Sequence, residues 1–167
     1  LLSTDRKQTD MTANLVANLL DVGIDYYFIL GSYARACDAY GRRLACVWST
    51  LLEPVHAARF REAAVSPVCR LWLLRHITFG RLVALGYSPM LLDSDVVVFH
   101  NPIPLMDAHL SNYSAVFLGD ASAGYVAVNG GVMRVRRARR DGHVAAIWTE
   151  FERRVMALLD PSKPYPK

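Results

Sequence analysis

The sequence predicts an α/β fold in which helices flank a mostly parallel central sheet. Two observations lead to this prediction. Stretches with helical spacing of apolar residues alternate along the chain with short apolar runs, and glycine or proline bounds most of these runs. A chain of 167 residues, 53% of them apolar and 20% charged, can bury a sizeable core. We therefore expect one domain over residues 1–167.

The first half of the chain predicts helix, strand, helix and strand in turn. Thr9 or Asp10 can cap a helix that ends at Gly23, because the apolar residues between them recur at helical spacing. After it we expect a strand at 25–30, a helix from Gly31-Ser32 to Tyr40 and a strand at 43–48. The alternation calls for a further strand before residue 9, and the sequence shows no clear run there.

The second half continues this pattern. Ser66-Pro67 begins a helix that Gly86 stops, and residues 51–65 are interpreted as a loop that contains a short helix. The remaining expected elements are a buried strand at 89–92, a short helix after Pro102 and Pro104 that extends to His109, a strand at 114–118, a loop at 119–124, extended runs at 125–128 and 132–135, and a helix at 141–159.

The two acids that follow the buried strand carry the strongest chemical indication. Residues two apart in an extended chain point to the same side, so Asp93 and Asp95 can present their carboxylates together at the carboxyl end of the strand. Two adjacent carboxylates favour a hard divalent cation such as Mg²⁺ or Mn²⁺, which keeps positions for water and phosphate. The pattern predicts a metal and diphosphate site. The alternative is a pair of acids that are solvated or cap a turn.

Other polar residues have two interpretations each. Asn129-Gly130-Gly131 is either a hairpin or bulge, or a segment whose backbone approaches a sugar or phosphate closely. Asp120 is either a polar group at the ligand edge of the sheet or a turn residue. Arg75 and Arg81 lie on the helix that leads to the acidic strand, where one of them can neutralise a diphosphate unless both are surface cations.

The formal net charge of +4 reflects an excess of arginine. A dense basic group can bind nucleic acid or an anionic membrane. Here the group has no interleaved aromatic residues and precedes an amphipathic helix, so it is interpreted as a solvated face and no nucleic-acid partner is predicted. Its members are Arg134, Arg136, Arg137, Arg139 and Arg140.

The three cysteines, Cys37, Cys46 and Cys69, are too scattered for a metal cluster. They are interpreted as small buried apolar residues, which leaves the redox compartment open. No apolar stretch is long enough to span a membrane.

Several of these segments together resemble a known family. They are Arg75, the Gly86-Tyr87 turn, the run through Asp93-Ser94-Asp95 to Phe99, Asn101-Pro102, and the segment from Val128 to Arg134. This combination resembles the nucleotide-diphospho-sugar transferases of the GT-A (Rossmann-like) fold, most of all the retaining family that includes plant cell-wall arabinosyl- and xylosyltransferases. The glycogenin-like family is the near neighbour.

The resemblance implies a metal-dependent glycosyltransferase that moves a sugar from a nucleotide-diphosphate donor, such as a UDP-sugar, to a hydroxyl of a glycan or glycoprotein with retention. Asp93 and Asp95 would bind Mn²⁺ or Mg²⁺. The substrate-binding residues would be Arg75, where the family usually has Lys, together with Ser94, Asp120, Asn129, Gly130 and Gly131. No catalytic nucleophile is assigned.

The same resemblance implies a partial transferase domain, incomplete at both ends. It also implies a type II membrane protein of the Golgi lumen whose anchor lies outside these residues.

Two alternatives remain. Leu91-Leu92-Asp93-Ser94-Asp95-Val96 also fits a haloacid-dehalogenase-type phosphatase, with Asp120 in place of its later acidic motif, although that nucleophile strand should open the domain. The other alternative is a non-catalytic binding module with a sugar-nucleotide fold.

Overall fold

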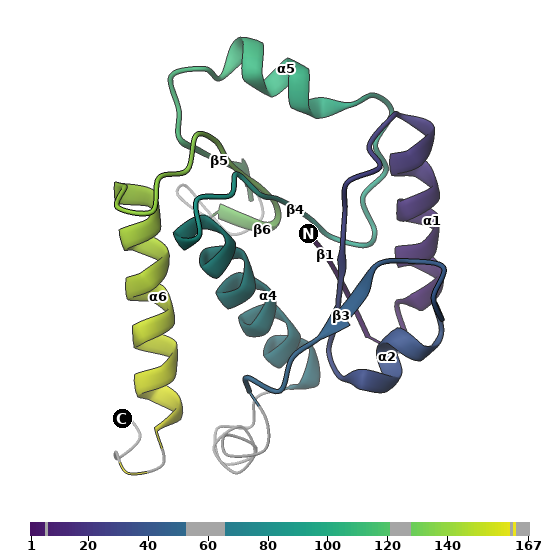
Figure 1. Ribbon diagram of the computed structural model, residues 1–167, viewed down its shortest axis with the longest axis horizontal. Coiled ribbons are helices and arrows are strands. Elements are labelled where there is room, and N and C mark those ends of the chain that lie inside the picture. The colour runs from purple at the N-terminus through teal and green to yellow at the C-terminus, as the bar shows by residue number, and fades with distance from the viewer. Residues whose placement is uncertain (6, 53–65, 121–127, 161, 163–167) are drawn as a thin grey trace.

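The computed structural model describes residues 1–5, 7–52, 66–120, 128–160 and 162, and it confirms a mixed α/β chain (Figure 1). Most of the loop with a short helix expected at 51–65, of the loop expected at 119–124 and of the extended run expected at 125–128 lies outside the described residues. In chain order the elements are β1 (Leu2–Thr4), α1 (Thr9–Asp21), β2 (Ile29–Gly31), α2 (Ala34–Asp38), β3 (Cys46–Trp48), α4 (Pro67–Ala84), β4 (Met90–Leu92), α5 (Pro102–His109), β5 (Ala115–Gly119), β6 (Val128–Val135) and α6 (His143–Leu159).

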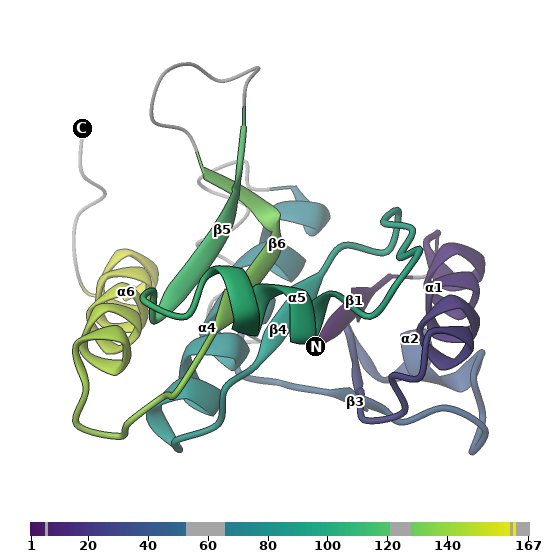
Figure 2. The same ribbon diagram turned by 90° about the horizontal axis from the view of Figure 1, so that it is seen from above.

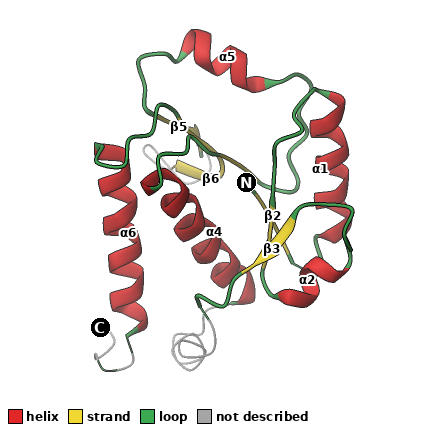
Figure 3. Cartoon of the chain, in the orientation of Figure 1, coloured by secondary structure: helices red, strands yellow, loops and turns green. Residues whose placement is uncertain are grey.

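Two three-stranded sheets form the centre of the molecule (Figure 3). In the first, β2 lies between β1 and β3 and all three are parallel; in the second, β6 lies between β4 and β5 and is antiparallel to both. Leu1 connects the sheets, because its backbone nitrogen donates to Met90 O at 2.7 Å and its carbonyl accepts from Leu92 N at 3.1 Å. This is the bonding pattern of parallel neighbours. Among the described strands, β6 alone therefore runs against the rest.

Helices cover both faces of the sheets. Successive side chains of a strand point to opposite faces, and here both sets of side chains are buried. Ile29 and Leu92 pack with α1, while their neighbours Leu30 and Leu91 pack with α4 and α6. The acidic strand is therefore buried on both faces as expected. Its partner β6 is antiparallel, however, which corrects the prediction that β4 lies among parallel neighbours.

Local sequence explains where α4 begins and ends. The Ser66 side chain accepts from Cys69 N, and Pro67 occupies the first turn, where its missing N–H has no cost. Gly86 has φ +91°, a conformation that glycine adopts readily at the end of a helix. These signals fix the length of α4 and thus the position of Arg75 within it.

Several sequence predictions are corrected. A strand does precede residue 9: β1 is fully buried and pairs with β2. Of the two shapes expected at Asn129-Gly130-Gly131, the hairpin is wrong and the bulge fits, because the extended runs form the single strand β6. Its register with β5 shifts where Phe117 pairs with Met133 and Leu118 with Asn129, so the extra residues lie on β6. The strands expected at 25–30 and 43–48 are shorter, because only Ile29–Gly31 and Cys46–Trp48 pair. Figure 2 shows β5 and β6 side by side.

Part of the basic group and the cysteines differ from expectation. Arg137, Arg139 and Arg140 are exposed as expected. Arg134 and Arg136 are 8% and 6% exposed, not a solvated face, because both pair with Asp107 of α5. Cys37 and Cys46 form a disulfide between α2 and β3, and Cys69 is a partly exposed free thiol. Among the described residues, no helix has the length and apolarity needed to cross a membrane.

Candidate functional site

An ion pair between α4 and the carboxyl end of β4 forms the centre of the candidate site. Arg75 Nη1 donates to Asp93 Oδ1, and Arg75 Nη2 donates to Gly130 O at 3.1 Å. The Arg75 side chain is 5% exposed, whereas Asp93 is 34% exposed. One guanidinium therefore joins three segments that lie far apart in the sequence: α4, the acidic segment and β6.

The Asn129-Gly130-Gly131 segment packs directly on Asp93. Asp93 N donates to Gly131 O at 2.7 Å, and Gly131 N donates to Asn129 Oδ1 at 2.7 Å. A Cβ on Gly131 would overlap the Asp93 carboxylate, and a Cβ on Gly130 would lie 3.1 Å from His76 Nε2. Neither glycine has a positive φ. Close approach of the backbone, and not a left-handed conformation, is therefore the reason for both glycines.

Both acids of the motif lie on one cavity. Asp93, Ser94, Asp95 and Arg75 line a space of about 130 Å³, together with residues from β1, α1 and the first turns of α4. Asp95 is exposed and Ser94 is buried. Both acids therefore border the same cavity. They do not do so as an extended chain, however, because residues 94 and 95 form a turn in which Val96 N donates to Asp93 O at 3.3 Å, and this corrects the expected strand geometry of the pair.

The donor set suits a hard divalent cation only in part. Two carboxylates on one cavity match the oxygen preference of Mg²⁺ and Mn²⁺. The described residues, however, include no group of three His, Cys, Asp or Glu that could hold a metal. Arg75 also occupies one oxygen of Asp93. A cation at this position would thus take further ligands from water or from a substrate.

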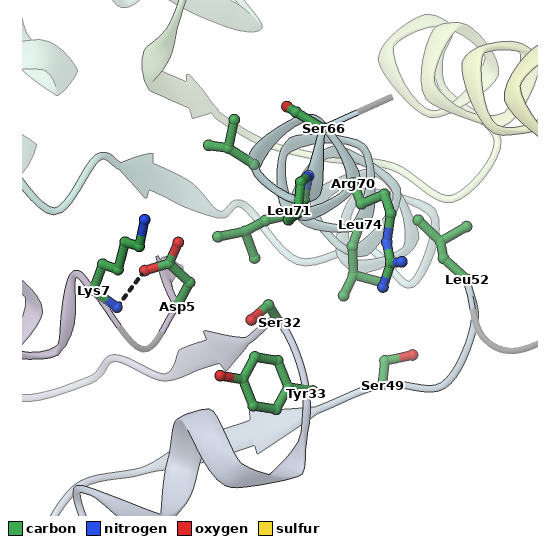
Figure 4. Close-up of a pocket in the computed structure, with 12 residues that line it drawn as sticks. Asp5, Lys7, Ser32, Tyr33, Ser49, Leu52, Ser66, Arg70, Leu71 and Leu74 are labelled. Carbon is green, nitrogen blue, oxygen red and sulfur yellow. Dashed lines mark hydrogen bonds between the residues drawn. The ribbon is translucent and has the colours of Figure 1, made fainter. Parts of the chain in front are cut away.

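A larger cavity of about 650 Å³ adjoins the small one, with Val68 and Leu71 of α4 lining both (Figure 4). Asp5, Ser32 and Ser49 follow the carboxyl ends of β1, β2 and β3 and form part of its wall. This is the edge at which open α/β sheets bind ligands, because loops and helix starts converge there. The two cavities together extend along this edge from β3 to β4.

The polar groups of the larger cavity are arranged around a fixed turn after β1. Asp5 Oδ1 accepts from Lys7 N at 2.8 Å and from Gln8 N at 3.0 Å, which holds this turn. Figure 4 shows Asp5 and Lys7 on one side of the cavity and Arg70 on α4. The described lining of the cavity thus includes two cationic side chains, and polar groups at the ends of three strands.

No family model, curated protein or solved structure matches this chain. The arrangement of its own side chains therefore carries the functional argument.

His76 adds an aromatic support behind the Gly130 backbone. Its ring lies 6.0 Å from Trp148, and its Nδ1 is 2.6 Å from Trp72 O. Burial lowers the pKa of His76 below its usual value of 6.5, so the ring is neutral at neutral pH. Because a carbonyl can only accept, the proton lies on Nδ1 and the bare Nε2 faces Gly130.

Most of the expected site residues lie close together in the structure. Arg75, Asp93, Asn129, Gly130 and Gly131 are in contact, and Ser94 and Asp95 share their cavity. The other two candidates lie elsewhere. Asp120 follows β5 at the same edge of the sheet but is not in the described lining of this cavity, and Arg81 pairs with Glu152 on α6.

Sequence reasoning missed the residues of the larger cavity. Ser32 and Ser49 directly follow strands that the sequence did predict, so the rule that ligands bind at carboxyl ends could have identified them. Asp5 and Lys7 follow β1, whose three residues, Leu2–Thr4, gave too little periodicity to be recognised.

Proposed function

We propose that this protein is a metal-dependent glycosyltransferase of the GT-A type, which transfers a sugar from a nucleotide-diphosphate donor to a hydroxyl of a glycan or glycoprotein with retention. One observation carries the proposal: Asp93, Asp95 and Arg75 line a small cavity that continues into a larger one at the carboxyl ends of β1, β2 and β3. The resemblance of the acidic and Asn-Gly-Gly segments to this family supports it.

The sizes and charges of the two cavities fit a nucleoside diphosphate. A space of about 650 Å³ lies in the range of roughly 300–1,000 Å³ that small-molecule sites occupy. The nucleoside would lie in this larger cavity, with its diphosphate directed to the smaller one beside Arg75 and the two acids. A bound Mn²⁺ or Mg²⁺ supplies electrostatic stabilisation of the departing diphosphate.

The Asn129-Gly130-Gly131 bulge would form the adjoining part of the sugar site. Its backbone packs against Asp93, so a sugar linked to a diphosphate at Asp93 would lie within reach of this segment. Arg75 holds Gly130 O and Asp93 at once, so it fixes the spacing between the acidic and glycine segments before substrate binds.

A Golgi-lumen location, with a membrane anchor outside these residues, is part of the same proposal. The disulfide between Cys37 and Cys46 fits an oxidising compartment.

The phosphatase alternative gains no support from the fold. Three of the described strands precede β4, and Asp93, which would be the nucleophile of the phosphatase, is engaged by Arg75 and packed against Gly131. A non-catalytic module remains the alternative outcome of the binding experiment below.

Calorimetric titration with UDP tests the proposal. In the presence of Mn²⁺ we expect saturable binding that EDTA abolishes and that Asp95→Asn and Asp93→Asn each weaken at least tenfold. Asp21→Asn, an exposed acid at the end of α1, is the matched control and should bind as the wild type does. UDP binding whose affinity is the same with and without Mn²⁺, and the same in the wild type and the two Asp→Asn variants, would contradict the proposal. Metal-dependent binding without sugar transfer to any hydroxyl acceptor would favour the module.

A further inference from the structure

A third cavity lies at the opposite edge of the sheets. Its volume is about 490 Å³, and Leu2, Phe28 and Met90 line it at the amino ends of β1, β2 and β4. Ile103 of α5 and Leu82 of α4 contribute further apolar wall. Its described lining shares no residue with the two cavities at the carboxyl ends. The proposed donor site therefore does not account for it.

Arg134 is the one cationic side chain in the described lining of this cavity. Arg134 lines the cavity, and its side chain is more than nine-tenths buried. Its Nη2 donates to Asp107 Oδ1 at 2.8 Å, but its buried Nε has no hydrogen-bond partner among the described residues. A buried guanidinium that is only partly bonded is costly, because burial removes the water that would otherwise solvate it.

The charges around Arg134 do not balance. Arg136 shares the same carboxylate, with Nε 2.6 Å from Asp107 Oδ1, and its Nη1 donates to Leu110 O at 2.7 Å. Two buried guanidinium groups thus face one carboxylate, and that carboxylate is 45% exposed. The three side chains carry one excess positive charge, and of the two arginines it is Arg134 that lines the cavity.

We propose that this cavity binds a free amphipathic monoanion, an apolar chain or ring with one carboxylate-type head group, and that Arg134 is its counter-ion. The volume lies in the range of small-molecule sites, the lining is mainly apolar, and a single excess charge matches a single negative head group. Tyr26 and Tyr87 of the lining are exposed, but the cavity has the volume of a site for one small molecule, so the ligand we propose is a free amphiphile and not a membrane.

α5 would take part in this site. None of its residues is buried, and it contributes both Ile103 to the wall and Asp107 to the arginine pair. Figure 1 shows this helix set apart from the other helices. A ligand anion at Arg134 would share the guanidinium with Asp107.

Decanoate and decanol separate charge recognition from simple apolar binding. Their affinities are measured on the whole chain by displacement of the fluorescent probe 8-anilinonaphthalene-1-sulfonate. A merely apolar cavity prefers the neutral alcohol, because an anion loses more hydration on entry. We expect saturable decanoate binding at least tenfold tighter than decanol binding. Arg134→Gln should reduce the decanoate affinity about tenfold and leave decanol unchanged. Arg153→Gln, an exposed arginine of α6, is the matched control and should change neither.

Equal affinities for the two ligands, or no saturable decanoate binding, would overturn the proposal with the wild-type protein alone. So would unchanged decanoate binding by a folded Arg134→Gln variant. If near-ultraviolet circular dichroism shows that this variant is unfolded, Leu82→Trp fills the cavity and leaves Arg134 in place, and it should abolish binding of both ligands. Binding to anionic phosphatidylserine vesicles that decanoate does not displace would likewise refute a free amphiphile as the ligand.

Discussion

Gly131→Ala should destabilise the protein by placing a methyl group where the Asp93 carboxylate lies. The added Cβ would overlap that carboxylate and lie 2.8 Å from Asn129 Oδ1, closer than carbon and oxygen approach in folded proteins. Asp93 cannot simply move aside, because Arg75 holds its side chain and Gly131 O holds its backbone nitrogen. The strain must therefore displace either the ion pair or the bulge of β6.

The magnitude follows from two limits. Overpacking a close contact costs about 1–3 kcal/mol, and breaking a buried ion pair costs about 3–5 kcal/mol. The second figure is an upper limit, because Asp93 is about one-third exposed and water would compensate part of the loss. We expect a loss of about 2–3 kcal/mol in the free energy of unfolding, which corresponds to a decrease in Tm of roughly 4–12 °C.

Urea unfolding of two further variants provides the comparison. Gly119→Ala is the matched control on the neighbouring strand, because a Cβ there meets nothing within 4 Å, and its stability should be unchanged or slightly increased. The stability of Gly130→Ala should lie between those of Gly131→Ala and Gly119→Ala, because its Cβ would lie 3.1 Å from the side chain of His76, which can shift. Equal stability of Gly131→Ala and Gly119→Ala would refute the packing argument.

Three further predictions concern other contacts. Asn18→Ala should cost about 1–3 kcal/mol in urea unfolding, because its side-chain amide bonds both Val98 O at 2.8 Å and Val98 N at 2.7 Å. Gly80→Ala should destabilise by about 1–3 kcal/mol although alanine favours helices, because its Cβ would lie 2.9 Å from Trp148 Cβ where α4 packs on α6. Burial lowers the pKa of His76 in the folded state, so the unfolded state binds the proton more readily as pH falls below 6.5. Stability should therefore decrease from pH 6.5 down through the folded pKa, and His76→Gln should reduce that slope.

Each of these predictions has an outcome that would contradict it. Asn14→Ala, on the exposed side of the same helix as Asn18, should be close to neutral, and equal losses at the two positions would contradict the role of the amide. A Gly80→Ala variant that is more stable than wild type would show that helix propensity outweighs the contact with α6. The same pH slope in wild type and His76→Gln would assign the titration to another group.

Local patterns in the sequence determined the helices that frame the site. Ser66-Pro67 and Gly86 set the limits of α4. The helix expected after Pro102 and Pro104 is α5, which begins at Pro102, where the Asn101 side chain accepts from Ile103 N. The buried strand before Asp93 was likewise evident from its apolar run. These features depend on residues within a few positions of one another, which is why a single sequence contains them.

Other features depended on partners that are distant in the sequence. The sequence around Arg134 and Arg136 is typical of surface cations, and only the position of α5 pairs them with Asp107. The spacing of Cys37 and Cys46 does not indicate a disulfide, and only the packing of α2 on β3 places the two residues together. Gly131 could have served a turn or a close contact, and only the position of Asp93 decided which. Local spacing does not encode such pairings.

The sequence by itself identified Asp93, Asp95, Arg75 and the Asn-Gly-Gly segment as candidates, because their residue types are unusual where they stand. Only the tertiary structure decided that Arg75 joins Asp93 to Gly130 and that the acidic cavity continues to the ends of β1, β2 and β3. The physical reason is strand order. Which strand ends share an edge is set by pairing across the sheets, and β1, the strand that bonds to β2 and through Leu1 to β4, was too short to be recognised from its own residues.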